Sequence, residues 1–242
     1  MREQILYYAI RYEGDWGKID KALRAQEPWE KIRYGEPYVT LGEKGYPKKL
    51  LKLQFPPWIL FYEGDLSLLN RPGVAVIGSR NCSAQGIHNT HHVTSLLKER
   101  YVILSGLAKG IDAAAHYEAL DHSTVGVIGC GLDVIYPLCN AELYETMRTR
   151  HLLISEYPRT TKPYAFHFPW RNRIIACLSE AVIVIEARKR SGSMLTVNEA
   201  INLDIPIYCL PAPYGILSRE GCNLLIAQGA NILVDDEDIS LI

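Results

Sequence analysis

Short apolar runs recur along the chain from residue 73 onward, and each ends at a small or polar residue. They occupy residues 74–77, 101–104, 124–128, 152–154, 181–185 and 207–210. Helical patterns follow three of them, over residues 85–99, 111–120 and 141–147. Continuous apolar runs of strand length are typical of strands buried on both faces, as in parallel sheets with crossover helices. The pattern predicts an α/β chain with an extended Rossmann-like fold and a mainly parallel sheet.

The first 55 residues follow a different pattern. Amphipathic spacing around residues 5–12 and 19–23 predicts two short helices, and a stretch rich in glycine and proline follows them. A short apolar strand is expected over residues 58–62. We therefore expect a short helical N-terminal module and linker over residues 1–55 and the Rossmann-like domain over residues 56–242.

Composition narrows the class of protein. The 242 residues are 48% hydrophobic, enough for one α/β domain with a small appendage. Lysine and arginine total 26 and aspartate and glutamate 27, so a formal net charge of −1 argues against a histone-like protein. We expect no signal peptide and no membrane span. Six scattered cysteines without a C-x-x-C pair favour free thiols, a cytoplasmic location and no metal site.

Glycine-rich turns follow the predicted strands at the sheet edge where ligands bind in open parallel sheets. Glycines let the backbone approach an anion, and the helix N-termini after them offer unpaired N–H groups. Ser79, Ser105, Gly106 and Gly110 are candidates for such an anion cradle, and Arg80 and Lys109 would supply charge. The alternative is that these glycines only form tight turns.

Two common nucleotide motifs do not fit these turns. Three residues separate Gly106 from Gly110, and Ile111-Asp112 follows, so the chain lacks a P-loop. Gly129 and Gly131 match the first two glycines of the dinucleotide fingerprint, but Val134 stands at the third position. We expect no cofactor.

The segment of residues 163–173 interleaves aromatic rings with cations and amides. Rings can stack on bases, and arginines can bind phosphates. Residues 158–190 hold seven basic residues against two acidic ones, a local excess of five. The alternatives are core packing beneath a loop and a solvated charged face. Beside a glycine-rich sheet edge, we favour a nucleic-acid groove.

Catalytic constellations are weaker. Asp112 and His116 are four residues apart on one predicted helix, and Glu156 ends a strand, so a hydrolytic site is conceivable. We favour structural roles for Asp112 and His116, as a helix cap and a polar partner. No catalytic residue is assigned.

Seven motifs in order resemble the DNA-processing protein A family (DprA, also called Smf) of bacteria, over roughly residues 40–238. They are Gly78-Ser79-Arg80; Ser105-Gly106-Leu107-Ala108-Lys109-Gly110-Ile111-Asp112; Gly129-x-Gly131-Leu132-Asp133-x-x-Tyr136-Pro137; Ser155-Glu156; Phe168-Pro169-x-Arg171-Asn172-Arg173-Ile174-Ile175; Ser191-Gly192-Ser193-Met194-Leu195-Thr196; and Gly221-Cys222-Asn223-x-Leu225-Ile226-x-x-Gly229-Ala230.

The resemblance implies a dimeric single-stranded DNA-binding protein, not an enzyme. Such a protein protects incoming DNA and loads the recombinase RecA during natural transformation and homologous recombination. The resemblance places DNA contacts at Ser79, Arg80, Ser105, Gly106, Lys109, Gly110, Phe166, Phe168, Arg171 and Asn172. It places a surface for the homodimer and for RecA around Leu225, Ile226 and Ile232.

One residue departs from the family pattern. Many relatives carry a basic residue after the Tyr-Pro pair, whereas this chain has Leu138, which implies either a weaker phosphate affinity or compensation by Arg159 or Lys162. The alternative function is a Rossmann-fold nucleoside-monophosphate phosphoribohydrolase. The Pro-Gly-Gly-x-Gly-Thr-x-x-Glu stretch of those enzymes is absent, and a loss of base release in Glu156→Gln would support that alternative.

Overall fold

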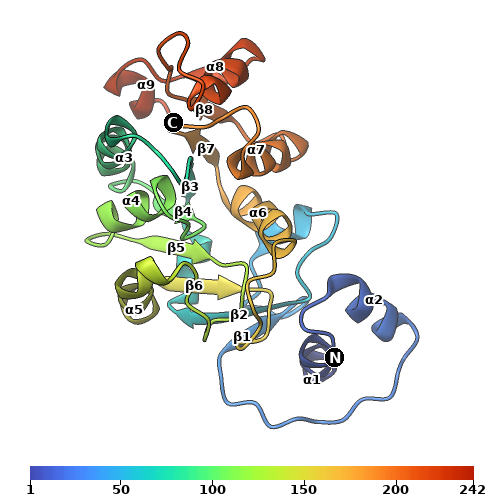
Figure 1. The fold of residues 1–242 in the computed structure, drawn as a ribbon. Helices are drawn as coiled ribbons and strands as arrows, with labels where there is room; N and C mark the ends of the chain where they lie inside the picture. The colour runs from blue at the N-terminus through green and yellow to red at the C-terminus, as the bar shows by residue number, and fades with distance from the viewer.

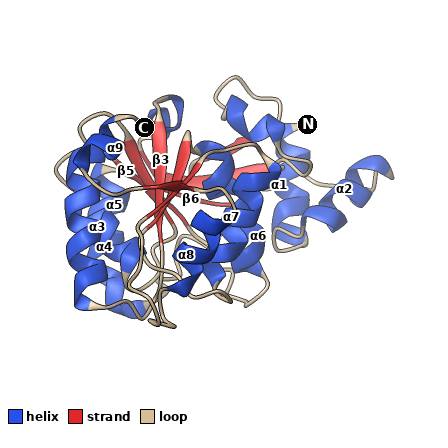
Figure 2. Ribbon diagram, turned by 90° about the horizontal axis from the view of Figure 1, so that it is seen from above, coloured by secondary structure: helices blue, strands red, loops and turns tan.

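The computed structural model describes residues 1–242 and has a central nine-stranded sheet between two layers of helices (Figures 1 and 2). The strand order is β1-β2-β6-β5-β4-β3-β7-β8-β9. The seven strands β6-β5-β4-β3-β7-β8-β9 pair parallel with their neighbours, whereas β2 pairs antiparallel with both β1 and β6. The Rossmann-like fold with a mainly parallel sheet is therefore confirmed. The strands are β1 (Tyr38–Thr40), β2 (Ile59–Gly64), β3 (Gly73–Ile77), β4 (Val102–Ser105), β5 (Thr124–Val127), β6 (Leu152–Ser155), β7 (Ala181–Val184), β8 (Ile207–Cys209) and β9 (Asn231–Ile232).

The helices cover both faces of the sheet. In the view of Figure 2, α3, α4, α5 and α9 lie on one side and α6, α7 and α8 on the other. The α-helices are α1 (Arg2–Arg11), α2 (Trp16–Arg24), α3 (Ala84–Leu97), α4 (Ile111–Glu118), α5 (Ala141–Arg150), α6 (His167–Leu178), α7 (Gly192–Asn202), α8 (Glu220–Ala227) and α9 (Asp236–Ser240). Three 3-10 helices are η1 (Lys48–Lys52), η2 (Leu66–Asn70) and η3 (Leu138–Asn140).

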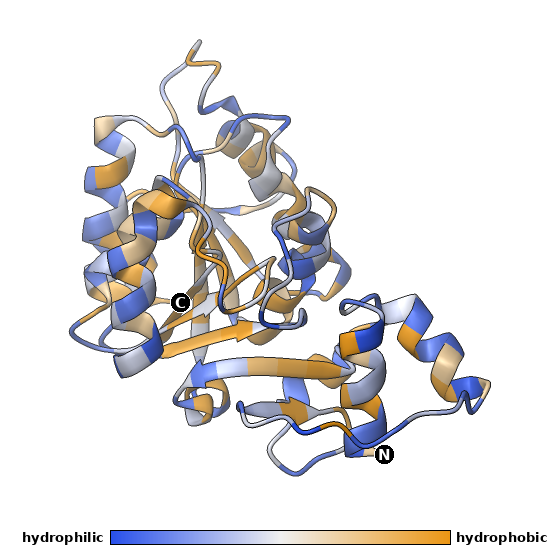
Figure 3. Cartoon of the chain, turned by 60° about the horizontal axis from the view of Figure 1, so that its bottom comes forward, coloured by the Kyte–Doolittle hydropathy of each residue, from blue (hydrophilic) through white to orange (hydrophobic).

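Strand β3 shows why its sequence is apolar throughout. Val74 and Val76 pack into the core beneath α3 and α4, whereas Ala75 and Ile77 pack into the core beneath α6 and α7. Successive side chains of a strand point to opposite faces, so a strand covered on both sides needs apolar residues at every position. Figure 3 shows the apolar colour along the strands and mixed colours on the helices.

The N-terminal region forms the two predicted helices, α1 and α2, but it is not separate from the sheet. Its linker supplies strand β1, which pairs with β2, and Val39, Tyr46 and Leu50 join the core beneath α6. Ile5 and Tyr8 of α1 share a core with Tyr144 of α5. The regions on the two sides of residue 55 therefore share packed cores, and their division into a module and a domain stays a prediction.

Two further features bear on the expectations. No helix has the length and apolar character needed to cross a membrane. The six cysteines are free thiols: Cys82, Cys130, Cys139, Cys177, Cys209 and Cys222.

Candidate nucleic-acid interface

The strand order reverses at β3, because β4 lies on one side of it and β7 on the other. Such a switch point opens a crevice beyond the carboxyl ends of the strands. A cavity of about 590 Å³ lies there, and we call it the switch groove. Its lining comes from the end of β3 and the loop after it, from the segments after β4 and β7, from the start of α7, from α6 and from two loops. The residues are 77–81, Ala108, Asp112, Tyr136, Pro163, Ala165, Phe168, Pro169, Arg171, Asn172, Ile175, Arg188, 191–193, Leu195 and Thr196.

Two glycines let the loops after β3 and β4 touch. Gly110 has a φ of +77°, and a Cβ there would collide with the Ser79 carbonyl oxygen. A Cβ on Gly78 would lie 2.6 Å from the side chain of Ile111. Close packing therefore accounts for both glycines, as the tight-turn alternative proposed. Gly192 differs, because a Cβ there would meet no atom within 4 Å.

The start of α7 gives the groove an electropositive backbone. Its N-cap residue Ser191 makes no side-chain cap, so the first N–H groups of the helix lack that partner. Ser193 Oγ donates to the Gly78 carbonyl at 2.8 Å, and Asn172 Nδ2 donates to the Gly192 carbonyl at 3.4 Å. These bonds hold the helix end at the groove, where it can bind an anion. The Ser191–Thr196 motif was visible in the sequence, but no residue of it was assigned to the site.

Exposed cations and one aromatic ring lie at the mouth of the groove. Arg80 is exposed, and its guanidinium carbon lies 5.7 Å from the centroid of the Phe168 ring. Arg188 is also exposed and lines the groove. Lys109 is exposed beside a smaller adjoining cavity of about 140 Å³, which Arg80 also lines.

Arg171 lines the groove but is only 4% exposed. Its guanidinium donates to the Val127 carbonyl, and Asp112 accepts a hydrogen bond from the Gly106 N–H at 3.2 Å. Burial lowers the pKa of Arg171 and raises the pKa of Asp112, while the attraction between the two charges opposes both shifts. A Cβ on Gly106 would collide with this guanidinium. Arg171 therefore braces the groove floor and presents little surface to a ligand.

Two arginines of the local excess are paired with carboxylates of the protein itself. Arg173 is 4% exposed and pairs with Glu156 at 2.6 Å, and burial raises the pKa of Glu156. Arg159 pairs with Glu63 and, at 2.6 Å, with Asp133. The excess of five therefore overstates the positive charge of the surface, and Arg159 is not free to compensate for Leu138.

Of the expected DNA contacts, five do not line the switch groove: Ser105, Gly106, Lys109, Gly110 and Phe166. Ser105 is fully buried, and its hydroxyl donates to the Val76 carbonyl at 2.7 Å, so it cannot face a ligand. Phe166 lines a second cavity, not the switch groove. Leu225 is 3% exposed within the core of this chain, so it is no surface residue. Ser79, Arg80, Phe168, Arg171 and Asn172 do converge on the groove.

The contacts of Asp112 and His116 support structural roles for both residues. Asp112 accepts its hydrogen bond from the Gly106 N–H in the preceding loop, so it does not cap its own helix. His116 Nδ1 lies 2.6 Å from Thr124 Oγ1, which itself donates to the Ile103 carbonyl at 2.8 Å. His116 is fully buried, and burial lowers its pKa to about 3. The pair serves loop and strand packing.

A Rossmann-like sheet with an arginine-lined groove at its switch point defines the class of this protein, and comparison with known proteins gives the family. Residues 37–241 match the family described as DNA recombination-mediator protein A. The chain belongs to this family. It is 43% identical over 205 residues to the DNA processing protein DprA of Streptococcus pneumoniae, covering 84% of this chain and 73% of the relative. It is 35% identical over 244 residues to the DNA processing protein DprA of Bacillus subtilis, covering 98% and 80%.

Two solved structures share the fold over most of their length. The X-ray structure of DNA processing protein A from Streptococcus pneumoniae matches with a TM-score of 0.84 and 36% identity, covering 100% of this chain and 93% of the other. DNA processing protein A from Helicobacter pylori, whose structure addresses its single-stranded DNA binding mode, matches with a TM-score of 0.78 and 32% identity. That match covers 87% of this chain and 97% of the other.

Proposed function

We propose that this chain binds single-stranded DNA in the switch groove and loads RecA onto the bound strand. The observation that carries the proposal is the convergence of Arg80, Arg188, the Phe168 ring and the uncapped start of α7 on one groove. Phosphates would accept hydrogen bonds from the arginines and from the helix N–H groups. A base would stack on Phe168, and stacking of this kind reads little sequence.

The second candidate, a phosphoribohydrolase, loses its proposed catalytic carboxylate in this geometry. Glu156 is 4% exposed, is bonded to Arg173 and does not line the switch groove. A binding protein that delivers a strand to RecA needs no catalytic group in the groove.

The proposal also assigns the homodimer surface. Of the three residues expected there, Ile232 in the edge strand β9 is 42% exposed and Ile226 is partly exposed. We propose that Ile226 and Ile232 form the contact between two copies. Because β9 ends the sheet and is only two residues long, side chains would supply most of this contact.

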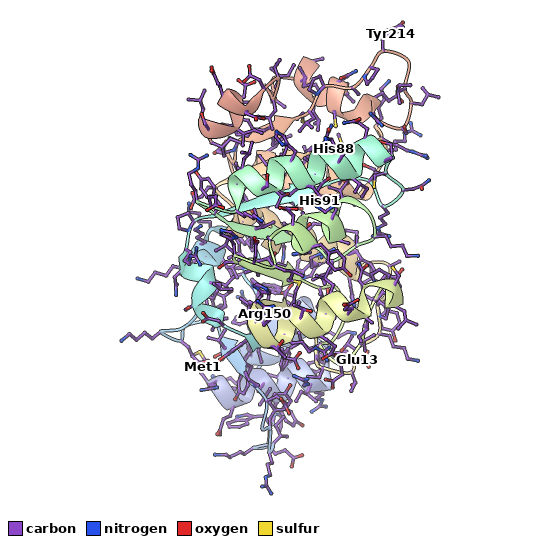
Figure 4. The ribbon with its side chains drawn as sticks, turned by 90° about the vertical axis from the view of Figure 1, so that its left-hand side faces the viewer. Met1, Glu13, His88, His91, Arg150 and Tyr214 are labelled. Carbon is purple, nitrogen blue, oxygen red and sulfur yellow. The ribbon has the colours of Figure 1, made fainter.

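Substitution of the groove arginines tests the proposal. Arg80→Ala and Arg188→Ala should each weaken binding of an oligothymidylate, and the slope of log K against log salt should become shallower by about 0.7 for each phosphate that is no longer neutralised. Fluorescence anisotropy across a salt series measures both quantities. Arg150→Ala is the matched control, because Arg150 is exposed on α5 (Figure 4), and α5 lies on the other side of the sheet from α6 (Figure 2).

RecA loading is measured with the same variants on a strand coated with single-strand-binding protein. Arg80→Ala and Arg188→Ala should lose stimulation of RecA filament formation, whereas Arg150→Ala should retain it. If both groove variants bind DNA as the wild type does, the assignment of the groove is wrong. If they lose DNA binding but still stimulate RecA, loading does not depend on the groove, and if the wild type itself gives no stimulation, the loading role is wrong.

A further inference from the structure

A second cavity, of about 570 Å³, lies between α2 and the first turn of α6. We call it the aromatic pocket, because rings from three parts of the chain line it. Trp16 and Phe55 meet edge to face with centroids 5.0 Å apart, and Phe55 lies 5.8 Å from Trp170. The remaining rings used below are those of Tyr164 and Phe166, which lie 5.7 Å apart and nearly parallel.

The aromatic pocket and the switch groove share one wall. Pro163 and Ala165 line the groove, whereas Tyr164 and Phe166 line the aromatic pocket. The same division continues into α6, where Arg171 lines the groove and Trp170 lines the pocket. The wall is therefore one loop segment that leads into α6, and its successive side chains line the two cavities in turn.

The rings at this wall are accessible from solvent. Phe166 is 70% exposed and Tyr164 is 43% exposed, although apolar rings of this size usually pack inside. Exposed rings beside a cavity are typical of sites that take a flat apolar ligand. The two rings stand where a chain leaving the groove would enter the pocket.

The two cavities differ in the charge of the residues that line them. The charged residues lining the aromatic pocket are Glu13, Asp15 and Lys18, a net charge of −1. The switch groove has three arginines and Asp112 as its charged lining. A phosphate is therefore favoured in the groove and disfavoured in the pocket, whereas a neutral base, which has N–H groups that can donate to carboxylates, suits rings beside Glu13 and Asp15.

We propose that the aromatic pocket holds a nucleobase of the same DNA strand that lies in the switch groove, with the strand crossing the wall at residues 163–166. This inference rests on the proposed function, because it extends the path of the strand from the groove. The two cavities lie on either side of one short segment, which favours a base of the bound strand over a side chain from a partner protein.

Gly17 offers a way to fill the pocket without disturbing its walls. Gly17 lies in α2 and lines the pocket, and a Cβ there would meet only Asp15 Oδ1, at 3.7 Å. Gly17→Leu should therefore occupy the cavity, and Gly17→Ala is the matched control that adds a single methyl group. Tyr164→Ala removes an exposed ring and provides an independent test. Equal melting temperatures show that the variants are folded.

Affinities for short and long oligothymidylates, of about 4 and about 16 nucleotides, distinguish the two cavities. For the long strand, Gly17→Leu and Tyr164→Ala should each lose about fivefold or more in affinity, the effect of one stacked base. Gly17→Ala should bind as the wild type does, and all variants should bind the short strand equally. Quenching of tryptophan fluorescence by the long strand should also diminish in Gly17→Leu.

Two results would overturn the inference in different ways. If Gly17→Leu and Tyr164→Ala bind the long strand as tightly as the wild type, while Arg80→Ala weakens it, the pocket takes no base and the groove assignment stands. If Arg80→Ala and Arg188→Ala leave both affinities unchanged, the proposed function fails, and the path built on it fails too.

Discussion

His116 shows how a single buried residue couples this fold to pH. Its native pKa of about 3 lies below the ordinary value of 6.5, because burial penalises the imidazolium. Between these two pH values, the unfolded chain binds a proton that the native chain does not. The free energy of unfolding should therefore decrease as the pH falls from about 6.5 toward 3, by up to about 1.4 kcal/mol per pH unit from this group.

The variant His116→Gln isolates that contribution. Urea unfolding at a series of pH values should give a shallower pH dependence for the variant, since His151 and His167, whose pKa values burial also lowers, remain in both proteins. Parallel curves for the variant and the wild type would show that His116 does not titrate on unfolding.

Helix α6 is held against the sheet by the buried pair of Glu156 and Arg173, at 2.6 Å. Glu156→Gln removes one charge and leaves the other buried, which should destabilise the protein by about 3–5 kcal/mol in urea unfolding. The double variant Glu156→Gln/Arg173→Met should recover most of this loss. Asp20→Asn breaks the exposed pair with Arg24 in α2 and should have no measurable effect.

The decisive measurement compares Glu156→Gln with the double variant. A Glu156→Gln protein as stable as the wild type would mean that the pair does not brace α6. The same result would reopen a chemical role for Glu156, which the phosphoribohydrolase alternative requires.

Elements differ in how much the sequence could predict. Strands β3 to β8 were predictable, because a strand covered on both faces is apolar at every position. Helix α6 was not, because residues 171–178 are buried all round and leave no helical alternation to detect. Strand β1 was hidden for another reason: it has only three residues and lies in a stretch of glycine and proline.

The sequence could predict where the candidate site lies but not which of its side chains are exposed. Glycines and cations after successive strands indicated the switch-point edge, since topology alone brings those ends together. The burial of Arg171 and Arg173 was not predictable, because their partners Asp112 and Glu156 are distant in sequence. A charged residue in a sequence is expected to be exposed to solvent unless a partner for its charge is known.

At the scale of the whole molecule, one chain presents two separate surfaces. The groove lies at the carboxyl ends of the central strands, while Ile232 lies in β9 at the edge of the sheet, next to β8. A dimer through β9 would therefore leave both grooves open. The same arrangement lets assembly and DNA binding be altered independently.

Ile232→Asp should convert the proposed dimer to a monomer, because it places a carboxylate in an apolar contact. Light scattering should give a mass near 27.3 kDa for the variant and about twice that for the wild type. Leu51→Asp is the matched control, since Leu51 is an exposed leucine away from β9. A wild-type mass of a single chain would contradict the proposed contact.

The wall at residues 163–166 has a consequence for how this protein tolerates change. Adjacent side chains there serve different cavities, so each substitution affects one cavity and spares the other. These residues form a loop and turn that lead into α6, so inserting or deleting one residue would shift the side chains that line both cavities at once. The length of this short segment is therefore a stricter requirement than its composition. Variants that keep four residues between 163 and 166 should retain both cavities more readily than variants with three or five.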